Sequence, residues 1–150
     1  MNLEELKISF LEKFPSIIFE ENTEWLTFSI DPAIIFSCFE SLKKDFAFDY
    51  LFCLTCIDYK TYFTMVYHLS GSSIRNINIV VKANVDRENP VIDSVTSIYK
   101  TAEFHEREVF DLFGIQFTNH PDLRRILLTD EWNGYPLRKD YEDSINMIKL

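Results

Sequence analysis

Two cysteines three positions apart, Cys53 and Cys56, have the spacing of a metal-binding or redox pair. The chain has no second pair of this kind, and its third cysteine, Cys38, lies well apart. An iron–sulfur cluster usually needs four thiolates, and residues three apart in a strand point to opposite faces of the sheet. We therefore interpret the cysteines as core residues, with a redox or metal role as the alternative.

The three histidines, His68, His105 and His120, are scattered, and no nucleophile motif accompanies them. His68 alternates with the apolar positions of a predicted strand, which indicates a half-buried residue. His120 precedes a proline, where hydrogen bonding is favoured over metal ligation. A free-standing hydrolase that uses His105, His120 or nearby carboxylates stays a remote alternative.

The densest charged pattern lies in a helix predicted at residues 101–113. On a helical wheel Glu106 falls beside an apolar sector, where a carboxylate costs free energy unless it is paired. Arginine is the expected partner because its planar guanidinium binds a carboxylate through two hydrogen bonds. Four of the six arginines lie in this helix or after it: Arg107, Arg124, Arg125 and Arg138.

This pattern predicts a carboxylate–guanidinium network that holds the following segment to the helix or to another chain. A solvated charged face is the alternative. An acid–base pair of Glu106 and Glu108 is disfavoured, because residues two apart on a helix point about 200° from each other. The segment after the helix mixes Arg, Leu, Pro and aromatic residues without a period, which is typical of interface anchors.

The elements that must position these residues follow from periodicity and capping. Helices are predicted at residues 3–14, 32–44 and 101–113, and strands at 25–30, 50–59, 62–69 and 74–83, with a polar loop at 84–90. Asn2 and Asp31 are the expected N-caps, and Gly114 ends the third helix. The order predicts an α+β fold: a two-layer domain with a mixed, largely antiparallel sheet packed by helices, followed by an irregular C-terminal tail. We expect an α+β core over residues 1–114 and an extended docking tail over 115–150, one structural domain in all.

Composition narrows the function. The 150 residues carry a net charge of -9, which argues against nucleic acid or anionic lipid as a direct partner. The three glycines, Gly71, Gly114 and Gly134, are too far apart for a phosphate-binding loop. No apolar run approaches the length of a membrane span, and the acidic N-terminus does not resemble a signal peptide. We expect no metal or cofactor in this chain.

Three linked motifs carry a family resemblance. They read EREVFDLFGI at residues 106–115, HPDLRRIL at 120–127 and GYPLRKDY at 134–141. Together they resemble the signature of the 30-kDa subunit of respiratory complex I, which in bacteria is the C subunit of NADH:quinone oxidoreductase. The first hundred residues are similar to this family only in length and element order. Tyr135 stands where the family often has histidine, and an aromatic ring there indicates a packing role.

The resemblance implies a non-catalytic peripheral-arm subunit that packs on the 49-kDa-type subunit, on the cytoplasmic side of the bacterial inner membrane. It implies that flavin and iron–sulfur clusters lie in partner subunits, and that this chain has no small-molecule substrate of its own. An equivalent subunit of a membrane-bound hydrogenase or of a ferredoxin- or coenzyme-linked dehydrogenase is the alternative. The implied interface residues are Glu106, Arg107, Glu108, Asp111, His120, Asp122, Arg124, Arg125, Pro136, Arg138, Lys139 and Asp140.

Overall fold

The computed structural model describes residues 2–74 and 77–148. Its helices are α1 (Leu3–Lys13), α2 (Ile35–Lys44), which follows a 3-10 turn η1 (Pro32–Ile34), and α3 (Ala102–Phe113). Its strands are β1 (Ile18–Phe19), β2 (Leu26–Ile30), β3 (Tyr50–Asp58), β4 (Tyr62–Ser70), β5 (Asn78–Asp86), β6 (Val91–Asp93) and β7 (Gln116–Thr118). The three predicted helices are confirmed.

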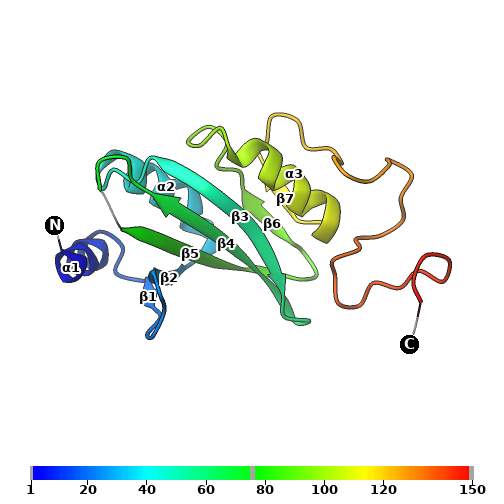
Figure 1. The fold of residues 1–150 in the computed structure, drawn as a ribbon, viewed down its shortest axis with the longest axis horizontal. Helices are drawn as coiled ribbons and strands as arrows, with labels where there is room; N and C mark the ends of the chain where they lie inside the picture. The colour runs from blue at the N-terminus through cyan, green and yellow to red at the C-terminus, as the bar shows by residue number, and fades with distance from the viewer. Residues whose placement is uncertain (1, 75–76, 149–150) are drawn as a thin grey trace.

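Five strands form one sheet in the order β1-β2-β5-β4-β3. Only the β2–β5 pair is parallel, so the predicted mixed, largely antiparallel sheet is confirmed. Helix α2 covers the back of this sheet, and α3 packs beside the edge strand β3 (Figure 1). Strands β6 and β7 form a separate parallel pair. The α+β class follows from these two layers.

The core lies between the sheet and the helices, and it extends to α3 through Val109 and to the β6–β7 pair through Ile92 and Phe117. Asn2 caps α1 in a reciprocal capping box with Glu5, as its sequence position predicts. From α1, Phe10 enters the core and makes edge-to-face contacts with the rings of Phe28 and Phe46. These aromatic pairs add to the free energy gained by burying apolar area.

The strand predictions differ from the structure in two places. The strand predicted at 74–83 is found as β5 at Asn78–Asp86, while residues 75 and 76 lie outside the described residues. Polar residues extend β5 because they face outward from the sheet, where Asn84 accepts a hydrogen bond from the Thr64 hydroxyl at 2.8 Å. The predicted loop at 84–90 is therefore wrong over its first three residues. Strands β1, β6 and β7 were not predicted, because two or three residues show no periodicity.

The tail begins with β7, which pairs with β6, so its first residues are not irregular. After β7 the described tail has no helix or strand, and it runs past α3 to the far end of the molecule from α1 (Figure 1). The domain boundary at residue 114 stays a prediction. Among the described residues, every helix is too short or too polar to cross a membrane.

Candidate docking site on the third helix

Asp111 organises the first contact between α3 and the tail. Its side chain is fully buried, and its Oδ2 accepts hydrogen bonds from the backbone N–H groups of Ile126, Leu127 and Leu128 at 3.2, 2.7 and 3.0 Å. Its Oδ1 lies 3.1 Å from Nη1 of Arg125. Burial alone would raise the pKa of Asp111, but these donors hold it below its ordinary value. The predicted carboxylate–guanidinium pair is thus present, between Asp111 and Arg125.

Arg107 complements Asp111 on the same helix. Its guanidinium donates to the backbone carbonyl oxygens of Arg124 and Arg125 at 3.1 and 3.0 Å. The residue is only 6% exposed, because the tail covers this face of α3. The alternative of a solvated charged face is therefore wrong for Arg107 and Asp111. We call residues 124–128 the first tail segment.

Glu106 has other partners than those expected. Its carboxylate accepts hydrogen bonds from the Ser94 hydroxyl at 2.6 Å and the Val95 N–H at 2.8 Å, and the residue is fully buried. The prediction that an arginine pairs with Glu106 is wrong. Burial raises the pKa of Glu106 to about 7 against the opposing effect of its two hydrogen bonds. A protonated carboxyl group carries no charge, so Glu106 can be buried without the guanidinium partner that a buried carboxylate needs.

His120 lies beside Glu106, with 3.9 Å between Nε2 and Oε2. The same Nε2 is 3.0 Å from the carbonyl oxygen of Glu103, and Nδ1 accepts the N–H of Asp122 at 3.0 Å. The predicted hydrogen-bonding role of His120 is confirmed. These contacts fix the start of the turn that leads into the first tail segment.

A second tail segment, residues 135–140, closes over the C-terminal end of α3. Arg138 Nε donates to the carbonyl oxygen of Phe113 at 2.6 Å, and the ring of Tyr135 lies 4.8 Å from the Arg138 guanidinium and 5.2 Å from that of Arg125. The packing role expected of Tyr135 is confirmed. Gly114 has a φ of +78°, and a Cβ there would come within 2.6 Å of Tyr135 and 2.7 Å of Arg138. Glycine is therefore required both by the backbone and by the close approach of the tail.

The second tail segment also binds two residues that sequence reasoning missed: Asp58 at the end of β3, beside the β3–β4 turn, and Arg87 directly after β5. Asp58 is buried and accepts hydrogen bonds from Arg87 and from the N–H groups of Lys60 at 2.6 Å and Lys139 at 2.8 Å. Arg87 also lies 2.9 Å from Asp140. Burial would raise the pKa of Asp58, but these donors lower it to about 2.

A signal for Asp58 was present in the sequence. In a strand, residues two apart share a face, so Asp58 falls on the same face as Leu54 and Cys56. A carboxylate on a buried face needs a partner. The partner itself could not be read, because Lys139 lies 81 residues away along the chain.

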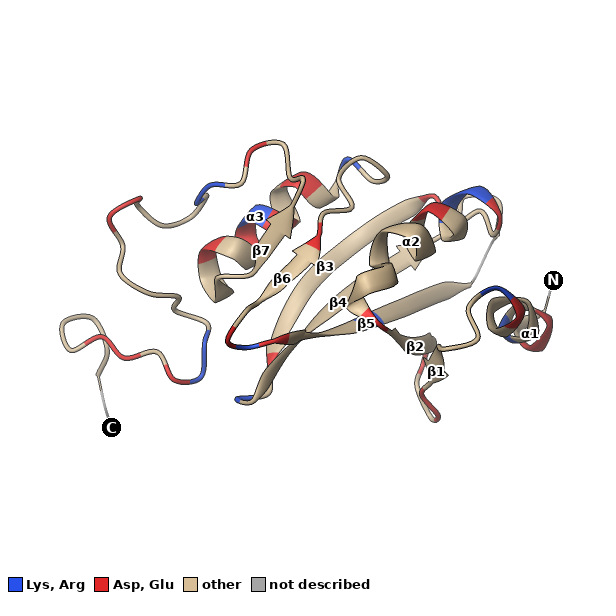
Figure 2. Ribbon diagram, turned by 180° about the vertical axis from the view of Figure 1, so that it is seen from behind, with Lys and Arg blue, Asp and Glu red and all other residues tan. Residues whose placement is uncertain are grey.

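The side chains of the remaining predicted interface residues make no hydrogen bond or ion pair with the buried carboxylates of the described chain. Asp122 and Arg124 form an exposed ion pair at 2.9 Å. Pro136 is half-buried within the second tail segment. Glu108 is exposed and lines a shallow groove with Phe104, His105, Ile126 and Leu127. Figure 2 shows acidic and basic residues along both α3 and the tail that follows it.

Cys53, Cys56 and His68 lie in the sheet, and Cys38 lies in α2. Cys53 pairs with His68 and Cys56 with Met65, so the two cysteines face opposite sides of the sheet, as predicted. Burial raises the pKa of Cys56 to about 12, which disfavours the thiolate. His68 is half-buried, as predicted, against the rings of Trp25 and Phe52. Within residues 2–74 and 77–148, no three His, Cys, Asp or Glu side chains are grouped to hold a metal ion.

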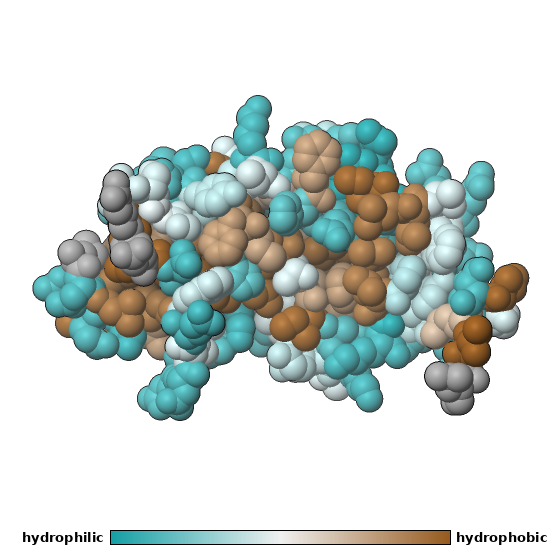
Figure 3. Space-filling view, in the orientation of Figure 1, coloured by the Kyte–Doolittle hydropathy of each residue, from teal (hydrophilic) through white to brown (hydrophobic). Residues whose placement is uncertain are grey.

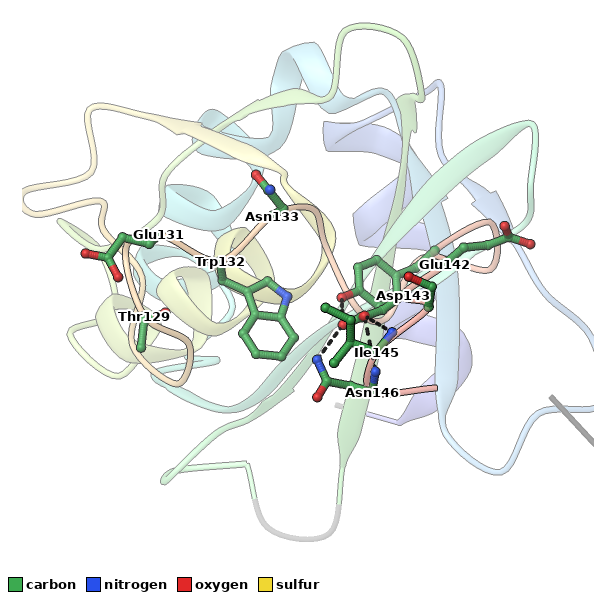
Figure 4. A pocket seen from close by; sticks show the side chains of 10 residues that line it. Thr129, Glu131, Trp132, Asn133, Glu142, Asp143, Ile145 and Asn146 are labelled. Atoms are coloured by element: carbon green, nitrogen blue, oxygen red, sulfur yellow. Dashed lines mark hydrogen bonds between the residues drawn. The ribbon is translucent and has the colours of Figure 1, made fainter. Parts of the chain in front are cut away.

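The last part of the tail folds back on itself around a pocket of about 420 Å³ (Figure 4). The Asp143 carboxylate accepts the N–H groups of Ile145 and Asn146, which forms a turn opposite the indole of Trp132. All lining residues belong to the tail between 129 and 146. The pocket is therefore part of the tail's own folding, and no element of the α+β domain lines it.

The chain matches one family model and, over most of their length, proteins named as C subunits of NADH-quinone oxidoreductase. The family model described as respiratory-chain NADH dehydrogenase, 30 Kd subunit, matches residues 28–145. The C subunit of the NADH-quinone oxidoreductase of Trichlorobacter lovleyi is 41% identical over an alignment of 136 residues, which covers 86% of this chain and 83% of that protein. The corresponding C subunit of Moorella thermoacetica is 38% identical over an alignment of 130 residues, which covers 85% of this chain and 87% of that protein.

Other relatives are longer. The combined C/D subunit of the NADH-quinone oxidoreductase of Phocaeicola vulgatus is 44% identical over 110 residues, but the match spans only 21% of its length. The C subunit of Chloroherpeton thalassium is 46% identical over 96 residues, and the match spans 40% of the length of that protein. The chain thus covers well under half of these two proteins.

Two solved structures have similar folds. A chain of the membrane-bound sulfane sulfur reductase, an archaeal respiratory membrane complex, superposes with a TM-score of 0.81 at 27% identity, covering 93% of this chain and 85% of that one. A trypsin-resistant fragment of Nqo5 superposes with a TM-score of 0.69 at 30% identity, covering 82% and 100%. Since the family model spans α3 and both tail segments, the chain belongs to the family of the 30-kDa subunit of respiratory-chain NADH dehydrogenase.

Proposed function

We propose that the chain is a non-catalytic peripheral-arm subunit of a proton-translocating NADH:quinone oxidoreductase, and that it supports electron transfer from NADH to quinone by assembling the arm. Its partner is the 49-kDa-type subunit, on the cytoplasmic side of a bacterial inner membrane. Flavin and iron–sulfur clusters belong to partner subunits. The family membership and the relatives named as C subunits of this oxidoreductase support the proposal.

One observation in the structure carries the proposal. Both tail segments are irregular chain, yet buried charges hold them on α3 and on the β3–β4 hairpin, while apolar side chains between the anchors stay exposed. Leu127 is 64% exposed and Leu137 is 52% exposed. A segment that is already ordered loses little conformational entropy when a partner binds. More of the free energy gained by burying its apolar side chains is then available for binding. This arrangement suits an assembly subunit.

Purification of the tagged chain from detergent-solubilised membranes of a host that assembles the complex tests the proposal. The expected result is stoichiometric recovery of the 49-kDa-type subunit and of subunits that carry flavin and iron–sulfur clusters. The isolated chain should show neither their absorbance nor NADH oxidation. Recovery of the chain alone, from membranes in which the complex is intact, would contradict the proposal.

The superposition on the membrane-bound sulfane sulfur reductase favours a second candidate, an equivalent subunit of a related membrane-bound complex such as a hydrogenase or a ferredoxin- or coenzyme-linked dehydrogenase. The same purification separates the two candidates. An NADH-binding flavoprotein among the recovered subunits supports the first, and its replacement by hydrogenase-type or ferredoxin-linked subunits supports the second.

A further inference from the structure

A shallow groove of about 280 Å³ lies between the outer face of α3 and the first tail segment. Its walls are largely apolar: Phe104 is 58% exposed, Leu127 64% and Ile126 38%. Apolar surface gathers over α3 and the tail that passes it in the space-filling view (Figure 3). Adjacent large apolar side chains left in solvent indicate an interaction site.

The walls of the groove are held in place from beneath. The N–H groups of Ile126 and Leu127 both bind the Asp111 carboxylate, which fixes the backbone from which their side chains project. On the opposite wall, the guanidinium of Arg107 lies 5.9 Å from the ring of Phe104. The buried Asp111 and Arg107 thus hold the exposed apolar side chains of the groove in place. A partner that binds there has little conformational entropy to remove from the groove.

The unpaired charge at the groove is negative. The Glu108 carboxylate makes no hydrogen bond or ion pair with the rest of the described chain. The neighbouring arginines are engaged: Arg107 with two tail carbonyl groups, Arg124 with Asp122, and Arg125 with Asp111. A partner that supplies a cation beside an apolar side chain would complement this surface.

We propose that the groove binds a segment of a partner subunit in which a lysine or arginine adjoins a large apolar side chain. The apolar side chain packs between Phe104 and Leu127, and the cation pairs with Glu108. The volume is below the usual range of small-molecule sites, which favours a single side chain as occupant. The inference rests on the proposed function, since it specifies the chemistry of a contact made by that subunit.

A photo-cross-linking amino acid at position 104, introduced into the tagged chain within the assembled complex, identifies the occupant directly. The expected cross-linked peptide comes from a partner subunit and has Lys or Arg within one helical turn of the labelled apolar residue. Cross-linking to lipid, to a second copy of this chain, or to a peptide without a basic residue would overturn the inference. So would an intact complex with no cross-link.

Charge reversal at Glu108 tests the ion pair. Glu108→Lys should weaken binding to the partner by about tenfold or more, the size of effect expected at an interface anchor. Glu12→Lys is the matched control, because Glu12 is an exposed glutamate on α1 at the other end of the molecule. Glu108→Gln should weaken binding less and should make it less sensitive to salt. Equal binding by the Glu108 and Glu12 variants would contradict the ion pair.

Leu127→Glu tests the apolar contact, with Ile18→Glu as its control because Ile18 is 70% exposed on β1. The first change should reduce recovery of the complex and the second should not. Unchanged circular dichroism and unfolding midpoints show that both variants fold. If no oxidoreductase subunit is recovered even with the unaltered chain, the proposed function fails. If recovery is normal with Glu108→Lys and Leu127→Glu alike, only the groove inference fails.

Discussion

Helices α2 and α3 are of similar length and both are amphipathic, but they bury different chemistry. Helix α2 turns Ile35, Cys38, Phe39 and Leu42 onto the sheet, all with no exposed area. Helix α3 buries Glu106, Arg107 and Asp111 in addition to its apolar residues. The two helices differ in what covers them: a sheet in one case, and irregular chain on one side in the other.

The difference follows from backbone hydrogen bonding. The strands under α2 satisfy their N–H and C=O groups within the sheet, so only apolar surface remains to be buried. The first tail segment has no such ladder, and a buried backbone group without a partner costs free energy. Asp111 accepts three of its N–H groups and Arg107 donates to two of its C=O groups. Charged side chains on α3 therefore replace a neighbouring strand.

The largest effect is expected from removing Asp111. Asp111→Ala leaves three part-buried N–H groups without their acceptor and removes the carboxylate that pairs with Arg125, which should lower the free energy of unfolding by about 3–5 kcal/mol. Urea unfolding measures this loss. Trypsin should also cleave rapidly after Arg124 and Arg125 in the variant at low urea, because the tail detaches before the sheet unfolds.

Phe39→Ala on α2 provides the contrast. Its cavity should lower the free energy of unfolding by a similar amount, about 3–5 kcal/mol, but the tail should keep its protection from trypsin in the folded state. If both variants expose the tail equally, the tail and the sheet unfold as one unit and the distinction between the two helices is wrong.

The next effect is a pH dependence from Glu106. Its pKa rises from 4.5 to about 7 on folding, so the folded chain retains a proton that the unfolded chain has lost between those values. The resulting stabilisation is fully present below pH 4.5 and falls by about 3 kcal/mol as the pH rises through 7. Unfolding measured between pH 5 and 8 should show this decline.

Glu106→Gln should remove the decline, because the amide can keep both contacts without ionising. The carboxyl groups Asp58 and Asp111, whose pKa values are lowered, change protonation below 3.8 and so lie outside this window. Burial also lowers the pKa of His68 from 6.5, but this contribution is the same in both proteins. Parallel pH profiles for the two proteins would contradict a protonated Glu106.

A smaller loss is expected at the end of α3. Gly114→Ala imposes a side chain on a backbone with φ of +78° and forces Tyr135 and Arg138 away, at a cost of about 2 kcal/mol. Thermal unfolding measures the loss. Trypsin cleavage after Arg138 and Lys139 should increase, while cleavage in the first tail segment should not. A protected second tail segment would show that it docks independently of this glycine.

The smallest effect is expected at the exposed ion pair. Arg124→Ala removes a side chain that is 66% exposed, so the isolated chain should lose less than about 1 kcal/mol. Arg125→Ala is the matched comparison, because Arg125 is 13% exposed and binds the buried Asp111. A large loss from Arg124→Ala in the isolated chain would mean that this residue anchors the tail after all.

Much of the fold was predictable because its signals are local. Asn2, Asp31 and Gly114 mark helix ends, and the apolar face of α2 repeats at helical spacing. The antiparallel β3–β4 pair follows from the short connection between two aromatic-rich runs. The parallel β2–β5 pair and the β6–β7 pair could not be predicted, since each joins strands that are distant in the sequence.

The location of the site and the types of its residues were predictable, but its individual contacts were only partly so. Charge density pointed to α3 and the tail arginines, yet the partner assigned to Glu106 was wrong, because Ser94 and Val95 carry no charge that would mark them. On a helical wheel Arg107 and Asp111 lie away from the apolar sector of α3, and the wheel contains no information on a tail that covers this side. The family motifs include Glu106, Arg107 and Asp111 but do not indicate which contacts these residues make.

The two tail segments differ in how much chain they enclose. The first closes onto α3 across 14 to 18 residues, whereas the bond from Lys139 to Asp58 spans 81. Loop closure over the longer span costs about 1.4 kcal/mol more and is slower to achieve. Loop closure therefore favours docking of the first segment on α3 before Lys139 reaches Asp58. A partner that meets the chain in between encounters a formed α3 surface beside a hairpin end that is still open.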